Sequence, residues 1–173
     1  MMNTKRKTIP TRIDGFEIRH AIEEDIPVIL SLIKELAVYE KLLHEVVTTE
    51  EVLKKNLFGQ KRYAETVLGY YLDEPVGFAL FFHNFSTFVG KPGLYLEDLY
   101  VKPEYRGKGF GKVLLEYLAR LAVERDCGRY EWAVLDWNEP ALKFYKSIGA
   151  RVMKEWLIHR MAGEELERLA NQF

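Results

Sequence analysis

A glycine-rich segment with basic side chains, Arg106-Gly107-Lys108-Gly109-Phe110-Gly111-Lys112, is the part of the sequence best suited to bind a ligand. Its three glycines allow backbone N–H groups to turn toward one point without obstruction by side chains. A strand is predicted before the segment and a helix after it. The positive end of the helix dipole then adds to the charges of Arg106, Lys108 and Lys112. The segment is therefore predicted to hold a pyrophosphate.

The spacing of this segment excludes two common phosphate-binding patterns. A P-loop requires Ser or Thr after the lysine, but Val113 follows Lys112. A dinucleotide fingerprint requires Gly-x-Gly-x-x-Gly, whereas this chain has Gly-x-Gly-x-Gly. The Arg-x-x-Gly-x-Gly form, after a strand that ends in Val-x-Pro, resembles the acetyl-CoA loop of the GNAT N-acetyltransferase superfamily.

Three other segments resemble one branch of that superfamily, the diamine (spermidine/spermine) and thialysine N-acetyltransferases. They are residues 36–40 (LAVYE), residues 95–101 (YLEDLYV) and residues 137–150 (WNEPALKFYKSIGA). The superfamily resemblance covers about residues 16–161. It implies a mixed α/β GNAT fold, with a central, mostly antiparallel sheet and helices on both faces. It also implies direct acetyl transfer from acetyl-CoA to a primary amine in a ternary complex.

This chemistry requires particular groups. A primary alkylamine has a pKa of about 10.4 and is mostly protonated at neutral pH, so the site must accept a proton from it. The oxyanion that forms on the thioester carbonyl needs hydrogen-bond donors, and the departing thiolate needs an acid.

Glu97 suits the proton acceptor, because it lies on the strand just before the glycine-rich segment. Strand alternation predicts Glu97, Leu99 and Val101 on one face and Asp98 and Tyr100 on the other. The resemblance implies that Glu97 binds the amine and relays its proton; a plain surface carboxylate is the alternative. Asp98 binds substrate or hydrogen-bonds the sheet, and both interpretations stay open.

Tyr145 suits the general acid, because a tyrosine hydroxyl is neutral at pH 7. Leu142, Tyr145 and Ile148 share a helical stripe, so core packing is the alternative. The Asn-x-x-Ala-x-x-Phe-Tyr spacing from Asn138 matches the resembled family. There the corresponding tyrosine approaches the sulfur of coenzyme A.

The resemblance implies two sets of site residues. The cofactor set is Leu99, Tyr100, Val101, Arg106, Gly107, Lys108, Gly109, Phe110, Gly111, Lys112, Asn138, Glu139, Pro140, Ala141 and Tyr145. The amine set is Tyr39, Glu40, Glu97, Asp98, Glu131, Trp132 and Glu155. For Tyr39 and Glu40 the alternative is an ordinary helix end. Around Glu155 the sequence departs from the polyamine enzymes.

Hydrophobic periodicity predicts the elements that position these residues. Strands are expected at 16–20, 63–72, 76–85, 93–101, 130–135 and 156–161, and helices at 26–43, 51–57, 110–125, 141–148 and 164–170. An antiparallel first half then leads into a strand–helix–strand crossover. We expect a flexible basic tail over residues 1–13 and a single domain over 14–173.

Composition narrows the class of protein. The 173 residues are 48% hydrophobic and 29% charged, which is typical of a globular domain. The net charge of −1 argues against a nucleic-acid partner. Cys127 is the single cysteine, and the four histidines lack ligand spacing, so neither a disulfide nor a metal is expected. The sequence shows no membrane-length apolar run and no signal peptide, which predicts a cytoplasmic protein without a membrane partner.

The sequence leaves the acceptor open. A diamine, a polyamine or a thialysine-like amino acid is expected, and a protein N-terminus, a lysine or an aminoglycoside is the alternative within the same fold. A non-catalytic module that binds coenzyme A is the alternative from another class, although such a module needs neither Glu97 nor Tyr145. A homodimer is expected from the resemblance and from the apolar residues Trp156, Leu157 and Ile158.

Overall fold

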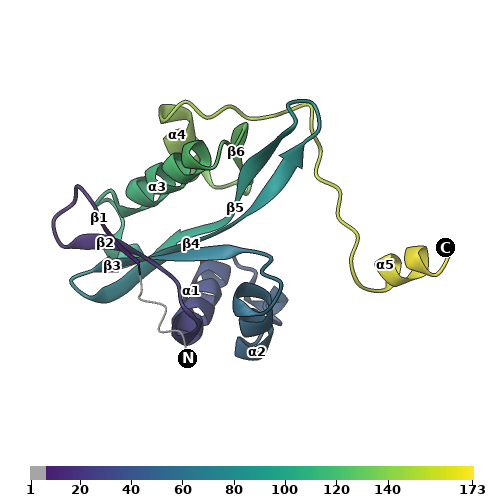
Figure 1. Cartoon of the computed structure of the whole chain (residues 1–173), viewed down its shortest axis with the longest axis horizontal. Helices are drawn as coiled ribbons and strands as arrows, with labels where there is room; N and C mark the ends of the chain where they lie inside the picture. Colours follow the sequence, from purple (N-terminus) through teal and green to yellow (C-terminus); the bar gives the residue numbers. More distant parts are fainter. Residues whose placement is uncertain (1–6) are drawn as a thin grey trace. The chain divides into compact units, whose positions relative to one another are not determined.

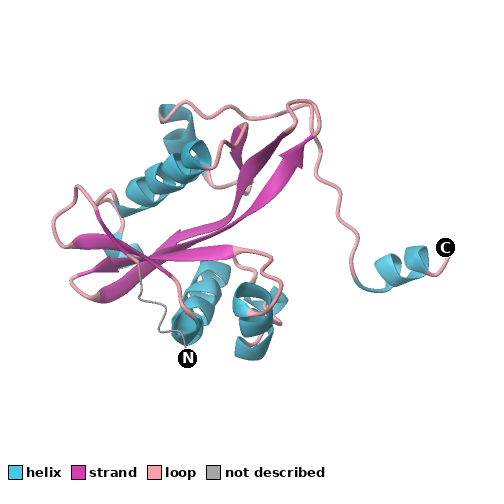
Figure 2. Ribbon diagram, viewed as in Figure 1, coloured by secondary structure: helices cyan, strands magenta, loops and turns pink. Residues whose placement is uncertain are grey.

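The computed structural model describes residues 7–173, which fall into two units, residues up to Ala133 and residues Val134–Phe173. The first unit is built on one six-stranded sheet in the order β1-β2-β3-β4-β5-β6 (Figures 1 and 2). Its strands are β1 (Thr8–Pro10), β2 (Phe16–His20), β3 (Glu65–Tyr71), β4 (Glu74–Ser86), β5 (Lys91–Val101) and β6 (Arg129–Trp132). All neighbours are antiparallel except β5 and β6, which are parallel. The mixed, mostly antiparallel sheet with helices on both faces is as predicted.

Helices of the first unit cover both faces of the sheet (Figure 1). On one face, α1 (Ile26–Tyr39) and α2 (Glu50–Leu53) pack over Phe78 and Tyr100, and α2 continues as a π-helical turn over Lys54–Phe58. On the other face lies α3 (Phe110–Glu124). Both long helices bury apolar residues at three- to four-residue spacing, as amphipathic helices do. The end of α1 and the start of α3 thus approach β5 from opposite faces.

A β-bulge interrupts β5 at Glu97. Leu80 of β4 faces Asp98, but the next residue, Phe81, faces Leu96, so Glu97 is the extra residue. Leu96 and Asp98 therefore lie on opposite faces of the sheet although they are two residues apart. The predicted placement of Asp98 and Tyr100 on one face and of Leu99 and Val101 on the other is confirmed, because these four residues pair with β4 without a break. The bulge changes the register before Asp98, so the face of Glu97 stays a prediction.

The N-terminal segment differs from the flexible tail that we expected. Thr8–Pro10 forms β1 and pairs with β2, and Arg12 forms an ion pair with Glu116 of α3. The edge of β2 offers backbone groups that a neighbouring strand can satisfy, which explains why these residues join the sheet. Residues 1–6 of the predicted tail lie outside the described residues.

The second unit contains α4 (Glu139–Ser147) and α5 (Gly163–Ala170). The strand predicted at Trp156–Met161 is wrong, because this segment has no strand pairing in the described chain. A turn in which Trp156 N–H donates to the Met153 carbonyl (3.3 Å) interrupts the extended backbone before it. Residues 151–162 are exposed. A single domain over 14–173 stays a prediction.

Candidate active site

The glycine-rich loop between β5 and α3 has the backbone geometry of a ligand cradle. Gly107 and Gly109 adopt φ values of +77° and +87°, which side chains rarely tolerate. A Cβ at Gly107 would meet nothing within 4 Å, so the space beside it is open. The helix begins at Phe110, and its first N–H groups have no carbonyl partner within the helix. These N–H groups and the helix dipole suit a pyrophosphate.

The lysines of the loop lie against groups of the protein itself. The Lys108 ammonium is 5.0 Å from the ring centroid of Tyr105 and 5.5 Å from that of Tyr71, within the range of a cation–π contact. The Lys112 ammonium lies 4.0 Å from a carboxylate oxygen of Glu116, one helical turn away. The loop backbone is therefore the better candidate for direct phosphate contact.

The Phe110 side chain is part of the core. It is only 2% exposed, and its ring stacks on Phe16 with centroids 4.2 Å apart. The predicted contact of Phe110 with the cofactor can therefore involve its backbone alone. The side chain of Tyr100 is likewise buried, and the predicted cofactor contacts of Leu99, Tyr100 and Val101 stay predictions.

Asp98 lies within electrostatic reach of two other carboxyl groups of the predicted amine set, Glu97 and Glu40. The pKa of Asp98 is raised to about 6, chiefly by burial and in addition by the charges of Glu97 and Glu40. Burial also raises the pKa of Glu40, which follows the last residue of α1. The bulge at Glu97 and the end of α1 thus bring two carboxyl groups into electrostatic reach of Asp98, and we call the three residues the carboxylate cluster (Glu40, Glu97 and Asp98). A cation is the natural ligand of such a cluster.

Arg106 links the loop to this cluster. Its Nε donates to the Val101 carbonyl (2.9 Å), and its guanidinium lies 4.4 Å from the ring centroid of Tyr39 and 5.5 Å from that of Tyr100. The Tyr100 hydroxyl donates to a carboxylate oxygen of Glu35 on α1 (3.4 Å). No sequence pattern singles out Glu35, although it lies one helical turn before Tyr39 on α1.

The carboxylate of Glu131 is hydrogen-bonded and its charge is balanced by a neighbouring cation. Its Oε2 accepts a hydrogen bond from Asn84 (3.0 Å) and lies 2.8 Å from Nε of Arg129. The ring of Trp132 contacts that of Tyr130, with centroids 4.9 Å apart. These contacts hold β6 together, and the predicted roles of Glu131 and Trp132 toward the amine stay predictions.

The remaining predicted residues belong to the second unit. Asn138 caps α4 by accepting a hydrogen bond from the Ala141 N–H (3.3 Å), and Pro140 occupies the first turn. The Tyr145 ring lies beside that of Phe144. Glu139 forms an ion pair with Lys143, and Glu155 is exposed. The structure explains the local helix, and the roles of these residues toward cofactor and amine stay predictions.

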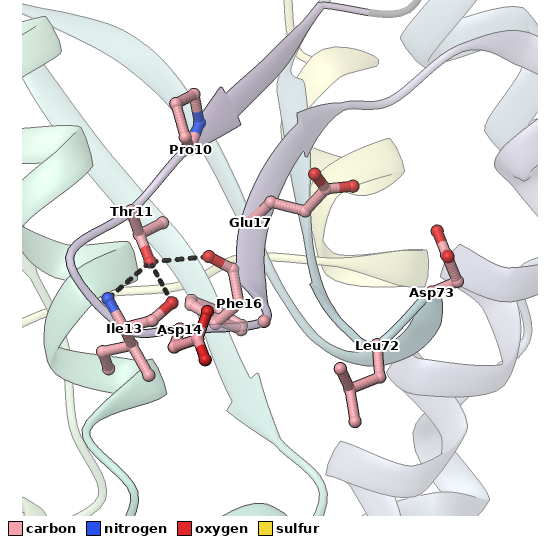
Figure 3. A pocket seen from close by; sticks show the side chains of 9 residues that line it. Pro10, Thr11, Ile13, Asp14, Phe16, Glu17, Leu72 and Asp73 are labelled. Carbon is pink, nitrogen blue, oxygen red and sulfur yellow. Dashed lines mark hydrogen bonds between the residues drawn. The ribbon is translucent and has the colours of Figure 1, made fainter.

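A hollow of about 390 Å³ lies elsewhere in the first unit, between the β1–β2 loop and the β3–β4 turn (Figure 3). Two of its carboxylates, Glu17 and Asp73, both pair with Arg19. In its wall the Ile13 N–H donates to the Thr11 hydroxyl (3.1 Å). Since none of the predicted site residues lines it, we do not place the chemistry there.

Two negative findings concern the described part of the chain. Within residues 7–173, no group of three or more His, Cys, Asp or Glu side chains is placed to hold a metal ion. Over the same range, no helix is long and apolar enough to cross a membrane.

Comparisons of the sequence with known proteins agree on one family. Residues 31–150 match the model of the acetyltransferase (GNAT) family. The chain is 39% identical over 166 residues to a thialysine N-epsilon-acetyltransferase of Sus scrofa, covering 90% of this chain and 97% of that protein. It is 35% identical over 213 residues to an L-ornithine N5-acetyltransferase of Arabidopsis thaliana, covering 96% and 93%. Among solved structures, an integron cassette protein from the mobile metagenome of V. cholerae superimposes with a TM-score of 0.77 at 28% identity, covering 90% and 98%.

Proposed function

Because the chain belongs to the GNAT acetyltransferase family, we propose that it transfers an acetyl group from acetyl-CoA to a primary amine of a small cationic acceptor. The carboxylate cluster next to the glycine-rich loop is the observation that supports this acceptor class. The names of two relatives, thialysine and ornithine acetyltransferases, describe amino acids with a second amine. We therefore expect a diamine, a polyamine or a thialysine-like amino acid.

Acetyl-CoA, when bound, supplies the activated acetyl group, and the backbone of residues 107–112 would hold its pyrophosphate. The positive φ values of Gly107 and Gly109 keep side chains away from that backbone, so a diphosphate can approach closely. The open space beside Gly107 fits the same assignment. On the resemblance of residues 137–150 to the acetyltransferase family, Asn138, Glu139, Pro140 and Ala141 are also proposed as cofactor residues.

The carboxylate cluster would bind the protonated amine and then take its proton. Glu97 is exposed at the bulge, where an incoming amine can reach it, and we assign the proton relay to it. Asp98 and Glu40 would hold the positive charge of the acceptor beside it. Once deprotonated, the amine nitrogen would attack the thioester carbonyl and lose its second proton to solvent as the amide forms. The carbon–sulfur bond breaks, Tyr145 donates its hydroxyl proton to the departing thiolate, and water returns a proton to Tyr145.

A panel of amines assayed with acetyl-CoA, read by thiol release, tests this proposal. The most informative pair is 1,4-diaminobutane and butylamine, which have the same chain length but differ in one positive charge. The carboxylate cluster predicts a KM about tenfold lower for the diamine.

Two results would count against the proposal. Binding of coenzyme A without thiol release for any amine would point to a non-catalytic module. Release only with peptides or aminoglycosides would keep the enzyme class and change the acceptor.

A further inference from the structure

The side chain of Arg106 connects the two halves of the proposed site. It extends from the cofactor loop, and its guanidinium lies over the rings of Tyr39 at the end of α1 and Tyr100 on β5. Both distances, 4.4 and 5.5 Å, are within cation–π range. One planar cation therefore touches both elements that carry the carboxylate cluster.

Its backbone attachment fixes this orientation. Nε of Arg106 donates to the Val101 carbonyl at 2.9 Å, where the chain leaves β5. The Nε donor and the face of the guanidinium are thus engaged by groups of the protein itself. The backbone N–H groups of the loop, by contrast, are suited to a phosphate.

The contacts of Arg106 bear directly on the position of the acidic groups. Tyr39 is the residue before Glu40, so holding its ring fixes the end of α1 that presents this carboxyl group. Tyr100 lies two residues from Asp98 on the same face of β5. Since Asp98 senses the charge of Glu40, the separation of the two groups depends on how α1 is held against β5.

We propose that Arg106 is a positioning residue of the amine site, which holds Tyr39 and Tyr100 so that Glu40 lies close to Asp98. This inference rests on the proposed function, and it assigns to a residue of the cofactor loop a role in acceptor binding. It replaces the role in phosphate contact predicted from the sequence.

Arg106→Lys separates the two roles. Lysine keeps the positive charge that a phosphate needs, but it lacks the planar guanidinium and the Nε donor. We expect the affinity for coenzyme A, measured by calorimetry, to stay within about twofold of wild type. With 1,4-diaminobutane as the acceptor, we expect KM to rise roughly five- to thirtyfold while kcat changes little.

Two further variants complete the comparison. Arg120→Lys makes the same exchange at an exposed arginine of α3 outside the predicted site, and it should leave KM for the diamine near wild type. Tyr39→Leu removes the aromatic face that Arg106 contacts and should reproduce the effect of Arg106→Lys, and the double variant of Arg106 and Tyr39 should be no worse than either single variant. Additive effects would overturn the proposal, as would an Arg106→Lys variant that binds coenzyme A poorly while its KM for the diamine is normal.

A titration of Asp98 in the protein without ligands tests the positioning role of Arg106 independently of catalysis. Followed by carbon-13 NMR, the pKa of the Asp98 carboxyl should fall in Arg106→Lys and stay unchanged in Arg120→Lys, because Glu40 moves away only in the first variant. An unchanged titration in Arg106→Lys would overturn the positioning role. If wild-type protein acetylates no amine, the proposed function fails, and this titration still tests Arg106. Melting temperatures identify any variant that has lost its fold.

Discussion

Glu97 lies on the bulge of β5 with its side chain exposed, and we expect it to take the proton of the amine. Glu97→Gln keeps the size of the side chain but cannot accept a proton. The variant should lose about 10²–10⁴-fold in kcat/KM near pH 7. Raising the pH toward about 10 should partly restore the activity, because more of the amine is then deprotonated in solution.

A pH–rate profile from 6 to 10 makes this measurement, with the exposed Glu104→Gln as control. A loss confined to KM without rescue at high pH would mean that Glu97 attracts the amine but takes no proton. A profile identical to wild type would remove Glu97 from the mechanism.

Asp98 differs from Glu97 because it is largely buried, and its raised pKa couples folding to pH. The folded-state pKa of about 6 exceeds the ordinary value of 3.8, so the folded state binds more protons between these values. The contribution of protonated Asp98 to the free energy of unfolding is therefore fully present below about pH 4, and it is lost as the pH rises through 6. A shift of about two pKa units corresponds to about 3 kcal/mol.

Asp98→Asn removes the buried charge that causes this loss. We expect the free energy of unfolding of the variant to exceed that of wild type at pH 8 by up to about 3 kcal/mol, with no gain at pH 4. Urea denaturation at the two pH values measures the difference. Equal differences at both pH values would show that the charge of Asp98 does not limit stability.

The bulge also shows what a sequence pattern omits. Phe16–His20 and the strand before the glycine loop follow from alternation and β-propensity, and both are confirmed. One extra residue at Glu97 then reverses the alternation, and no local signal marks it. The partners of Arg106 are equally hidden, since Tyr39 lies on a distant helix and nothing in the local pattern pairs Arg106 with Tyr100.

Among the elements, the turn into α3 requires a left-handed backbone conformation. Gly109 precedes the helix at φ +87°, and a Cβ there would lie 3.3 Å from Cδ1 of Ile13. Gly109→Val should cost about 1–3 kcal/mol of stability through strain. It should also weaken coenzyme A binding, because the side chain obstructs the loop.

Gly90→Val is the matched control for this turn. Gly90 has φ +69° with nothing within 4 Å of its Cβ position, so valine there adds similar strain outside the loop. Calorimetric titration with coenzyme A should show weaker binding for Gly109→Val alone. Equal binding by both variants would remove the pyrophosphate from this loop.

His20 of β2 contacts α3, on the face of the sheet opposite to α1. Its Nε2 lies 2.6 Å from the Tyr117 hydroxyl, and it senses the charges of Lys7, Glu65 and Arg125. Burial lowers the pKa of His20, and the cations Lys7 and Arg125 add to this effect against Glu65. Below pH 6.5 the unfolded chain therefore binds more protons than the folded one, so stability falls as the pH falls through this range.

His20→Gln should reduce this loss. We expect the melting temperature of the variant to fall less than that of wild type between pH 7.5 and 5.5. For a chain of this size, 1 kcal/mol corresponds to about 2–4 °C, which thermal melts resolve. The exposed His159→Gln serves as control and should follow wild type. Parallel pH dependence of wild type and His20→Gln would exclude His20 as the cause.

For the whole molecule, the sequence correctly predicts the fold class, because β-rich segments, turn signals and one amphipathic crossover helix leave few topologies. It fails at Trp156–Met161, where β-propensity is high but strand pairing requires a neighbour that this segment lacks in the described chain. It also fails at Thr8–Pro10, where a short stretch without apolar alternation is held by the edge of β2. In both segments, the presence or absence of a neighbouring strand from elsewhere in the chain decides whether a strand forms.

The segment Trp156–Met161 is also the basis for the prediction of a homodimer. Trp156, Leu157 and Ile158 are 68%, 79% and 77% exposed, and a second copy of the chain could cover such a run of apolar side chains. We expect sedimentation at micromolar concentration to give about twice the 20.3 kDa of one chain. Ile158→Glu should shift the distribution to the single-chain mass, since burying a carboxylate in an apolar contact is costly. Phe88→Glu, at a 93% exposed position on the β4–β5 turn, is the control and should leave the mass unchanged. A mass near that of one chain for the wild type would contradict the prediction, and dissociation by Phe88→Glu instead would place the contact on the hairpin.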